Sequence, residues 1–215
     1  LQKSMPALSS VAEILPSYTV FAASVPVGDL DTYTDAYKSF LDSRNALQKS
    51  LSAQKVMEDK AGISPYDFMV NAGVKEAATA SFMVAGKLEK INLLKTGKKM
   101  PELLENKEKE WPYAGFASSV FGNLFALEDE SCFTYMNGWL ISGSRRAVDE
   151  YASGMALEYP LKTYMADAGK SDLLAAHQSA FVAYFSFTED RAELSRIFRN
   201  VLLDDLKALS SDAEY

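Results

Sequence analysis

The alternation of apolar and polar side chains is clearest between Cys132 and Gly154, where the chain reads CFTYMNGWLISGSRRAVDEYASG. Asn137-Gly138 is a dipeptide that tolerates the two positive φ angles of a type I′ turn, so this segment predicts a β-hairpin. The expected cross-strand pairs are Met136 with Trp139, Tyr135 with Leu140, and Thr134 with Ile141. Apolar residues then lie on both faces of the hairpin, and we expect other elements to pack over each face.

A short helix is expected directly after the hairpin. Ser144 occupies an N-cap position, and Gly154 occupies the position of a C-terminal glycine. The inward-facing residues at helical spacing are Ala147, Val148, Tyr151 and Ala152. We therefore interpret the GSRR sequence chiefly as the start of a helix.

Strands and helices alternate along the rest of the chain without the regular rhythm of parallel βαβ units. Strands are expected at 18–27, 75–94, 113–131 and 177–187, the second being either one bent strand or a hairpin that turns at Gly86-Lys87. A first helix is expected to begin at Asp29 or Asp31, and a second helix is expected to end at about Lys60. Further helices are expected at 64–73, at 158–169 and from Arg191, with a charged surface connection at 95–111. The first helix has an inward-facing stripe of Tyr33, Tyr37, Phe40, Leu41 and Leu47.

These elements predict an α+β fold, a mostly antiparallel sheet of about five to seven strands with helices packed against it. We expect residues 1–215 to form a single α+β domain. The units 18–48 and 179–209 share the order apolar strand, acidic cap and amphipathic helix, which fits either a remote repeat or two unrelated units that obey the same local rules. Because the chain begins without Met, we expect it to be part of a longer precursor.

The charge of the chain limits its partners. Its 215 residues carry 22 basic and 29 acidic side chains, a formal net charge of −7 at pH 7. This balance repels polyanions and provides no basic stripe, so we expect no nucleic acid partner. No run of apolar residues approaches the roughly 20 that span a bilayer, so we expect no transmembrane segment. Proteins and carbohydrates are the candidate partners that remain.

The helix start at Ser144 is one candidate binding site. Free backbone N–H groups, together with Arg145 and Arg146, are the ingredients of a phosphate or carboxylate site. The spacing matches neither a P-loop nor a dinucleotide-binding fingerprint. Two interpretations therefore stand side by side, an anion site at these three residues and ordinary helix capping.

Catalytic and metal-binding side chains are scarce. His177 is the one histidine, and no GxSxG motif accompanies it, so a Ser-His-Asp hydrolase is not predicted. Only His177 and Cys132 could supply nitrogen and sulfur ligands, so we expect no structural zinc. We interpret His177 as a surface or edge residue and Cys132 as a small buried residue that has no disulfide partner. The sequence identifies no catalytic residue, no metal site and no cofactor.

Three consecutive acids, Glu128, Asp129 and Glu130, precede the hairpin. Their oxygens could in principle bind Ca²⁺, but their spacing is not that of an EF-hand loop. Three adjacent acids are more often a solvated turn, which is the interpretation favoured here. A carboxylate pair for glycosidase chemistry cannot be recognised from spacing, because the two partners come from distant elements.

The segment WPYAGF places Trp111, Tyr113 and Phe116 beside a proline. Exposed aromatic rings of this kind can stack on sugars or on partner side chains, which makes Trp111 and Tyr113 candidate ligand-binding residues. The alternative is that Trp111 packs at the domain edge and Phe116 enters the core, because large aromatic side chains supply much of the area that a core buries.

The opening strand LPSYTVFAASVPV and the segment CFTYMNGWLISGSRRAVDEYASG resemble uncharacterised extracytoplasmic bacterial proteins, often lipoproteins of Bacteroides-type organisms. In those proteins a strand containing G-W-L and S-x-S precedes a helix with A-V-[DE]. The resemblance implies an exported α+β domain, in the periplasm or at the cell surface, whose signal segment has been removed. It brings no known catalytic residues with it.

We therefore expect a cell-envelope domain that acts as a non-enzymatic binding or structural module. The alternative is a carboxylate-dependent hydrolase that acts on carbohydrate. A cleft with two carboxylates roughly 5 to 10 Å apart would favour the hydrolase. An exposed aromatic or apolar patch without such a pair would favour the binding module.

Overall fold

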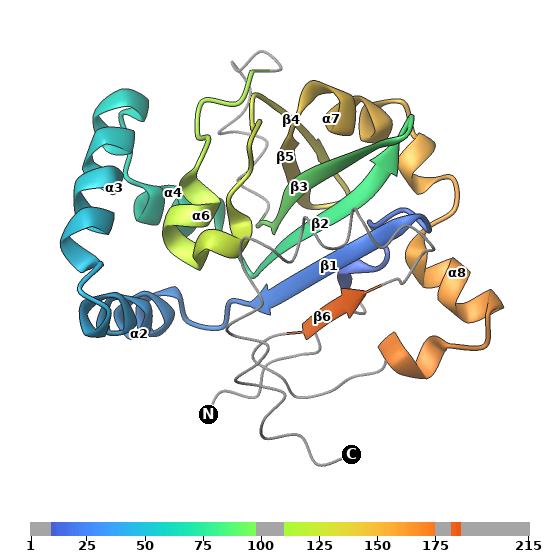
Figure 1. Ribbon diagram of the computed structural model, residues 1–215, viewed down its shortest axis with the longest axis horizontal. Helices are drawn as coiled ribbons and strands as arrows, with labels where there is room; N and C mark the ends of the chain where they lie inside the picture. The colour runs from blue at the N-terminus through green and yellow to red at the C-terminus, as the bar shows by residue number, and fades with distance from the viewer. Residues whose placement is uncertain (1–9, 98–109, 175–181, 186–215) are drawn as a thin grey trace. The chain divides into compact units, whose positions relative to one another are not determined.

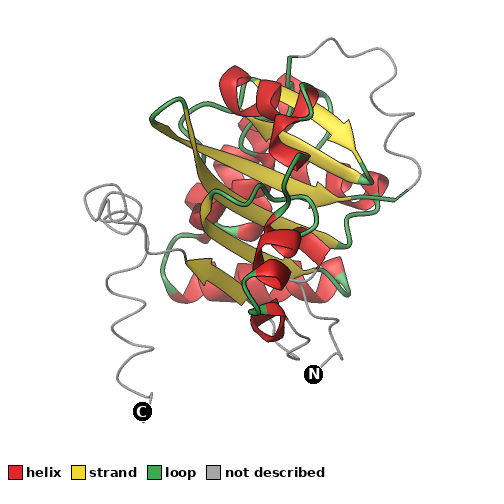
Figure 2. Ribbon diagram, turned by 90° about the vertical axis from the view of Figure 1, so that its right-hand side faces the viewer, coloured by secondary structure: helices red, strands yellow, loops and turns green. Residues whose placement is uncertain are grey.

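The computed structural model describes residues 10–97, 110–174 and 182–185. In this part of the chain six strands form one antiparallel sheet of order β4-β5-β3-β2-β1-β6 (Figure 1). The strands are β1 (Thr19–Pro26), β2 (Glu76–Val84), β3 (Lys87–Lys95), β4 (Cys132–Met136), β5 (Trp139–Gly143) and β6 (Val182–Phe185). Helices flank this sheet (Figure 2), so the fold is α+β with helices packed on an antiparallel sheet, as predicted.

Helix ends follow the caps that the sequence provides. The α-helices are α2 (Leu30–Ser43), α3 (Leu47–Ala61), α4 (Pro65–Ala72), α6 (Phe116–Phe121), α7 (Arg145–Ala152) and α8 (Leu161–Asp167), with short 3₁₀ turns η1 (Asn123–Phe125), η2 (Met155–Leu157) and η3 (Ser171–Leu174). Asp29, Ser64 and Ser144 accept hydrogen bonds from the first backbone N–H groups of α2, α4 and α7. Gly73 ends α4 in the left-handed conformation.

Two hairpins build the centre of the sheet. Asn137 and Gly138 both have positive φ, and all three predicted pairs across β4 and β5 are confirmed. The 75–94 segment is a hairpin and not a bent strand, but its turn residues are Ala85 and Gly86, one position before the prediction. Ala85 adopts a φ of 48°, which a non-glycine residue rarely does.

The sheet is apolar on both faces because strand residues alternate between two clusters. On one face Ala80, Phe82, Ile91 and Ile141 pack with Tyr151 of α7, Leu161 of α8 and the segment from Val11 to Leu15. On the other face Ala77, Leu94 and Leu140 pack with α4, α6 and the aromatic residues near Trp111. The expectation that something packs over each face of the β4–β5 hairpin is therefore confirmed.

Some predicted elements are wrong. The segment 113–131 is not a strand but contains α6 and η1, because Gly115 and Gly122 both have positive φ and break an extended path. Leu47 begins α3 and does not continue α2, and Ala152 is exposed.

The residues that lie outside the described parts of the chain include His177, most of the charged connection and most of the second proposed repeat unit. No helix among the described residues combines the length and apolarity that crossing a membrane requires.

Candidate functional site

The candidate aromatic platform lies in the core. Trp111 is 6% exposed and Tyr113 is 8% exposed, so the expectation of an exposed stacking surface at these rings is wrong. Both rings pack on Phe68 of α4, with ring centroids 5.8 Å and 4.5 Å away. Phe116 is buried beside them, in line with the alternative interpretation.

The candidate anion site at Ser144 is filled by the protein's own carboxylate. The Ser144 hydroxyl accepts a hydrogen bond from Ala147 N–H at 3.2 Å and donates one to Glu89 Oε2 at 2.6 Å. Arg146 forms an ion pair of 3.6 Å with Glu89 Oε1, and Arg145 is exposed. Glu89 therefore already occupies the hydroxyl donor and the guanidinium that Ser144 and Arg146 would otherwise offer to an anion.

The three acids before the hairpin separate in space. Glu128 and Asp129 are exposed, whereas Glu130 is buried, so the interpretation of all three as a solvated turn is wrong for Glu130. Asp129 accepts a hydrogen bond from Ser131 N–H and closes a local turn. Among the described residues no group of His, Cys, Asp and Glu is arranged to hold a metal ion.

Glu130 belongs to a buried polar centre that also contains Lys90, Asn92 and Ser142. Asn92 of β3 and Ser142 of β5 are cross-strand partners whose side chains face α6 and η1. Glu130 Oε1 accepts hydrogen bonds from Ser142 Oγ at 2.7 Å and from Asn92 Nδ2 at 3.3 Å, and Oε2 accepts one from Gly115 N–H at 2.7 Å. One carboxylate therefore connects the sheet with the start of α6.

Lys90 and Asn92 make the remaining contacts of the polar centre with the backbone around η1. Asn92 Nδ2 donates to Phe125 O at 2.9 Å. Lys90 Nζ donates to Leu124 O at 2.7 Å and to Ala126 O at 3.0 Å. These side chains satisfy carbonyl groups that a 3₁₀ turn leaves without partners, so they fix η1 on the sheet.

Burial shifts both ionisable groups of the polar centre toward neutrality. It raises the pKa of Glu130, and the hydrogen bonds from Gly115, Ser142 and Asn92 partly offset this rise. The indole of Trp111 also lowers the pKa of Glu130, although its N–H makes no hydrogen bond of normal geometry. Burial lowers the pKa of Lys90 to about 8. Such shifts suit acid–base chemistry, but here both groups are engaged with the protein's own backbone and neighbours.

A second buried carboxylate, Glu76, lies on the opposite face of the sheet. It lies on the same face of β2 as Ala78 and Ala80, which face the α7 side, whereas Asn92 and Ser142 face the α6 side. Its oxygens accept hydrogen bonds from Ser24 at 2.7 Å and from Ser10 at 2.8 Å, and burial raises its pKa. Because the sheet separates them, Glu76 and Glu130 do not form the carboxylate pair that a glycosidase needs.

Helices α2 and α3 form a second candidate feature, which we call the α2–α3 arm (residues 30–61). They contain 14 and 15 residues, and neither helix has a buried side chain. Figure 1 shows the arm beyond α4 and α6, with which α3 makes contact. Phe40 is 51% exposed, Leu51 39% and Val56 68%, so Phe40 is not the core residue that its place in the apolar stripe predicts.

An aromatic column runs along α2 from the core to solvent. Tyr33 packs against Phe121 with ring centroids 5.5 Å apart. Tyr33 and Tyr37 stack at 6.4 Å, and Tyr37 and Phe40 stack at 6.3 Å, with interplanar angles of 22° and 19°. The guanidinium of Arg44 lies 5.5 Å from the centre of the Phe40 ring. The core therefore supports the inner end of a column whose outer end is exposed.

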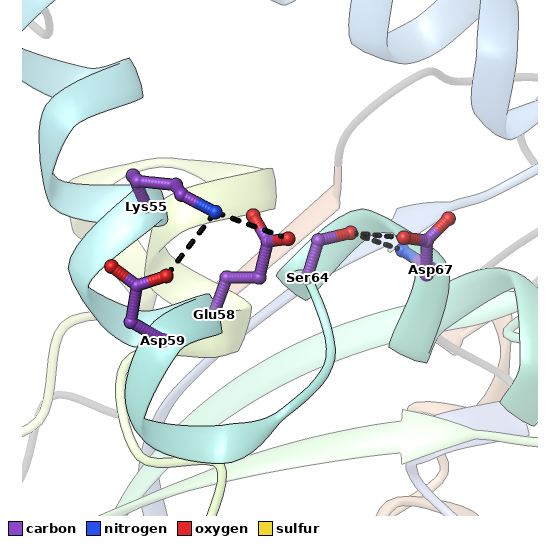
Figure 3. A network of polar contacts seen from close by, with 5 residues as sticks. All are labelled: Lys55, Glu58, Asp59, Ser64 and Asp67. Atoms are coloured by element: carbon purple, nitrogen blue, oxygen red, sulfur yellow. Dashed lines mark hydrogen bonds and ion pairs between the residues drawn. The ribbon is translucent and has the colours of Figure 1, made fainter.

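Local polar contacts stabilise the end of the arm near α4. Lys55 pairs with Glu58 at 3.5 Å and with Asp59 at 3.1 Å, both one helical turn away (Figure 3). Ser64 donates to Asp67 at 2.6 Å and accepts from its backbone N–H at 3.0 Å, which fixes the start of α4 (Figure 3). These contacts are local to each helix, and the arm meets the core through partly buried side chains that include Tyr33 and Met57.

Comparison with known proteins gives no relative: no protein-family model, no curated protein and no solved structure matches the chain.

The sequence did not identify either the polar centre or the exposed end of the arm. The sequence contains a signal for the polar centre, because Asn92 interrupts the apolar run of β3. A polar side chain in a buried strand needs a hydrogen-bond partner that is also buried. For the second, the periodicity of α2 shows an apolar stripe but not whether anything covers it.

Proposed function

We propose that this protein is a non-enzymatic interaction module and that the α2–α3 arm is its contact surface for another protein. The observation that carries the proposal is a pair of helices without a buried side chain that exposes Phe40, Leu51 and Val56. Exposed apolar patches often mark protein interaction sites, and these three side chains lie on one helix pair, Phe40 on α2 and the other two on α3.

The charge of the arm favours a protein over a polyelectrolyte as the partner. Residues 30–61 contain five acidic and five basic side chains, whereas the whole chain carries a net charge of −7. A surface of balanced charge with aromatic and arginine residues has the composition of protein–protein contacts.

The location remains part of the proposal. The resemblance to extracytoplasmic lipoprotein-type domains supports a place in the periplasm or on the cell surface, where the arm would meet another envelope protein. The polar centre then has a structural role, because it fixes the α6–η1 segment that α3 contacts.

A triple variant tests the proposal. Phe40→Ser, Leu51→Ser and Val56→Ser together should leave the free energy of unfolding within about 1 kcal/mol of wild type, because these side chains are exposed. In extracts of cells that produce the protein naturally, the variant should elute from a sizing column as a smaller species than wild type.

The matched control substitutes three other exposed apolar residues, Met155, Tyr164 and Leu173, with serine. This control should elute with wild type. If both variants elute alike, the arm is not the contact surface and the proposal fails.

A further inference from the structure

The exposed face of α2 has an uneven distribution of charge. A helix turns about 100° per residue, so the members of the aromatic column and Arg44 fall within a sector of about 60°. The charged residues of the opposite side are Asp31, Asp35, Lys38 and Asp42. From Tyr33 to the C-terminal end of α2, the aromatic face therefore carries one charge, and that charge is positive.

Arg44 is also free to meet a partner. It is exposed, and it forms no ion pair with any residue in the described parts of the chain. Its guanidinium stays close to the Phe40 ring, at 5.5 Å from the ring centre. When a carboxylate of a partner binds Arg44, the partner's neighbouring side chains therefore come close to the Phe40 ring. Arginine and aromatic residues are the residue types that contribute most to interface energies.

We propose that the partner docks on Tyr37, Phe40 and Arg44 with a segment in which an apolar side chain is flanked by carboxylates. This inference rests on the proposed function and specifies the chemistry of its partner. The apolar side chain covers the exposed part of the Phe40 ring, and a carboxylate forms a hydrogen-bonded ion pair with Arg44. A polyphosphate would also satisfy Arg44, but it has no apolar group to cover the exposed Phe40 ring beside that guanidinium.

The test uses the full chain and two labelled peptides of equal length, each with Phe and Leu at helical spacing. One peptide carries Glu on both sides of its apolar residues, and the other carries Lys at the same positions. Fluorescence anisotropy should show tighter binding of the Glu peptide. Arg44→Glu should weaken that binding by about fivefold or more and should improve binding of the Lys peptide. Phe40→Ala should weaken binding of both peptides by about fivefold or more.

Lys38→Glu is the matched control, because it makes the same change of charge on the opposite side of the same helix. It should change both affinities by about twofold or less. Equal responses to Arg44→Glu and Lys38→Glu, or no preference for the Glu peptide, would overturn the inference. Dimers of the chain alone that Phe40→Ala abolishes would also overturn it, because the arm would then bind a second copy.

The two proposals fail in different ways. If the triple serine variant loses its native partner while the peptides show no charge preference, the contact surface stands and the partner chemistry is wrong. If the triple variant keeps its partner, the proposed function itself is wrong.

Discussion

The hydroxyl of Ser142 donates a hydrogen bond of 2.7 Å to the buried carboxylate of Glu130. Ser142 lies on β5, and Glu130 lies in the loop before β4, so the contact joins the hairpin to the segment that crosses the α6 side of the sheet. The same carboxylate holds Gly115 N–H at 2.7 Å, directly before α6. This one carboxylate therefore helps to position α6, in addition to the buried apolar side chains of that helix.

Replacement of Glu130 should destabilise the protein. Glu130→Ala leaves the Ser142 hydroxyl and the Gly115 N–H without their partner in a buried environment, which costs about 2 to 4 kcal/mol. Urea unfolding measures this loss. Glu128→Ala is the matched control, because Glu128 is an exposed acid two residues away and should change stability by about 0.5 kcal/mol or less. Equal effects of the two substitutions would show that the hydrogen bonds of Glu130 do not fix α6.

Lys90 should make the protein more stable as the pH rises. Burial lowers its pKa in the folded state from 10.5 to about 8, so between these values the unfolded chain binds more protons than the folded protein. Stability then increases with pH through this window, by up to roughly 2 kcal/mol once partial solvent screening is included. Unfolding free energies between pH 7 and 9.5 measure the slope.

Lys90→Met should flatten this slope, whereas Lys87→Met should leave it unchanged. Lys87 is on the same strand and exposed, which makes it a matched control. A wild-type slope that survives Lys90→Met would assign the pH dependence to other groups.

The buried acid Glu76 should produce an opposite trend at low pH. Its pKa in the folded state lies above 4.5, so the folded protein binds more protons than the unfolded chain between 4.5 and that raised value. The contribution of Glu76 to stability is therefore largest at and below pH 4.5 and falls as the pH rises through the folded pKa. Glu76→Gln should remove this dependence, since the Ser10 and Ser24 hydroxyls can rotate to bond an amide. An unchanged pH profile in the Glu76→Gln protein would contradict this assignment.

The hydroxyl of Tyr151 should contribute little to stability. Tyr151 is a fully buried residue of α7, and its hydroxyl has no hydrogen-bond partner among the described residues. Tyr151→Phe should therefore change the free energy of unfolding by about 0.5 kcal/mol or less, or raise it, because it removes an unpaired polar atom. Tyr151→Ala should cost about 3 to 5 kcal/mol through the cavity it leaves. A loss above about 1 kcal/mol in Tyr151→Phe would mean that the hydroxyl has a partner.

The sequence predicts what short-range rules control. The turn at Asn137-Gly138, the N-caps at Asp29, Ser64 and Ser144, and the antiparallel α+β class all follow from local residue chemistry. Prediction from the sequence fails where contacts with distant residues determine the local structure. The segment around α6 has the apolar composition of a strand, but a glycine of positive φ lies at each end of the helix, and Gly115 N–H bonds to the distant carboxylate of Glu130.

The candidate sites show the same limit. Trp111 and Phe40 are both aromatic residues beside polar neighbours, yet Trp111 is buried and Phe40 is exposed. No periodicity distinguishes them, because burial depends on which distant element packs against each ring. The sequence indicates that Ser144 is a cap, but its partner Glu89 lies on β3, 55 residues away in sequence.

The most direct test of the central claim is site-specific photo-crosslinking in cells that produce the protein naturally. A photoreactive amino acid replaces Phe40 in one protein and Leu173 in another, since both side chains are exposed. We predict a covalent adduct with one other protein from position 40 and none from position 173. Adducts from position 173 alone, or from neither position, would contradict the assignment of the α2–α3 arm as the contact surface.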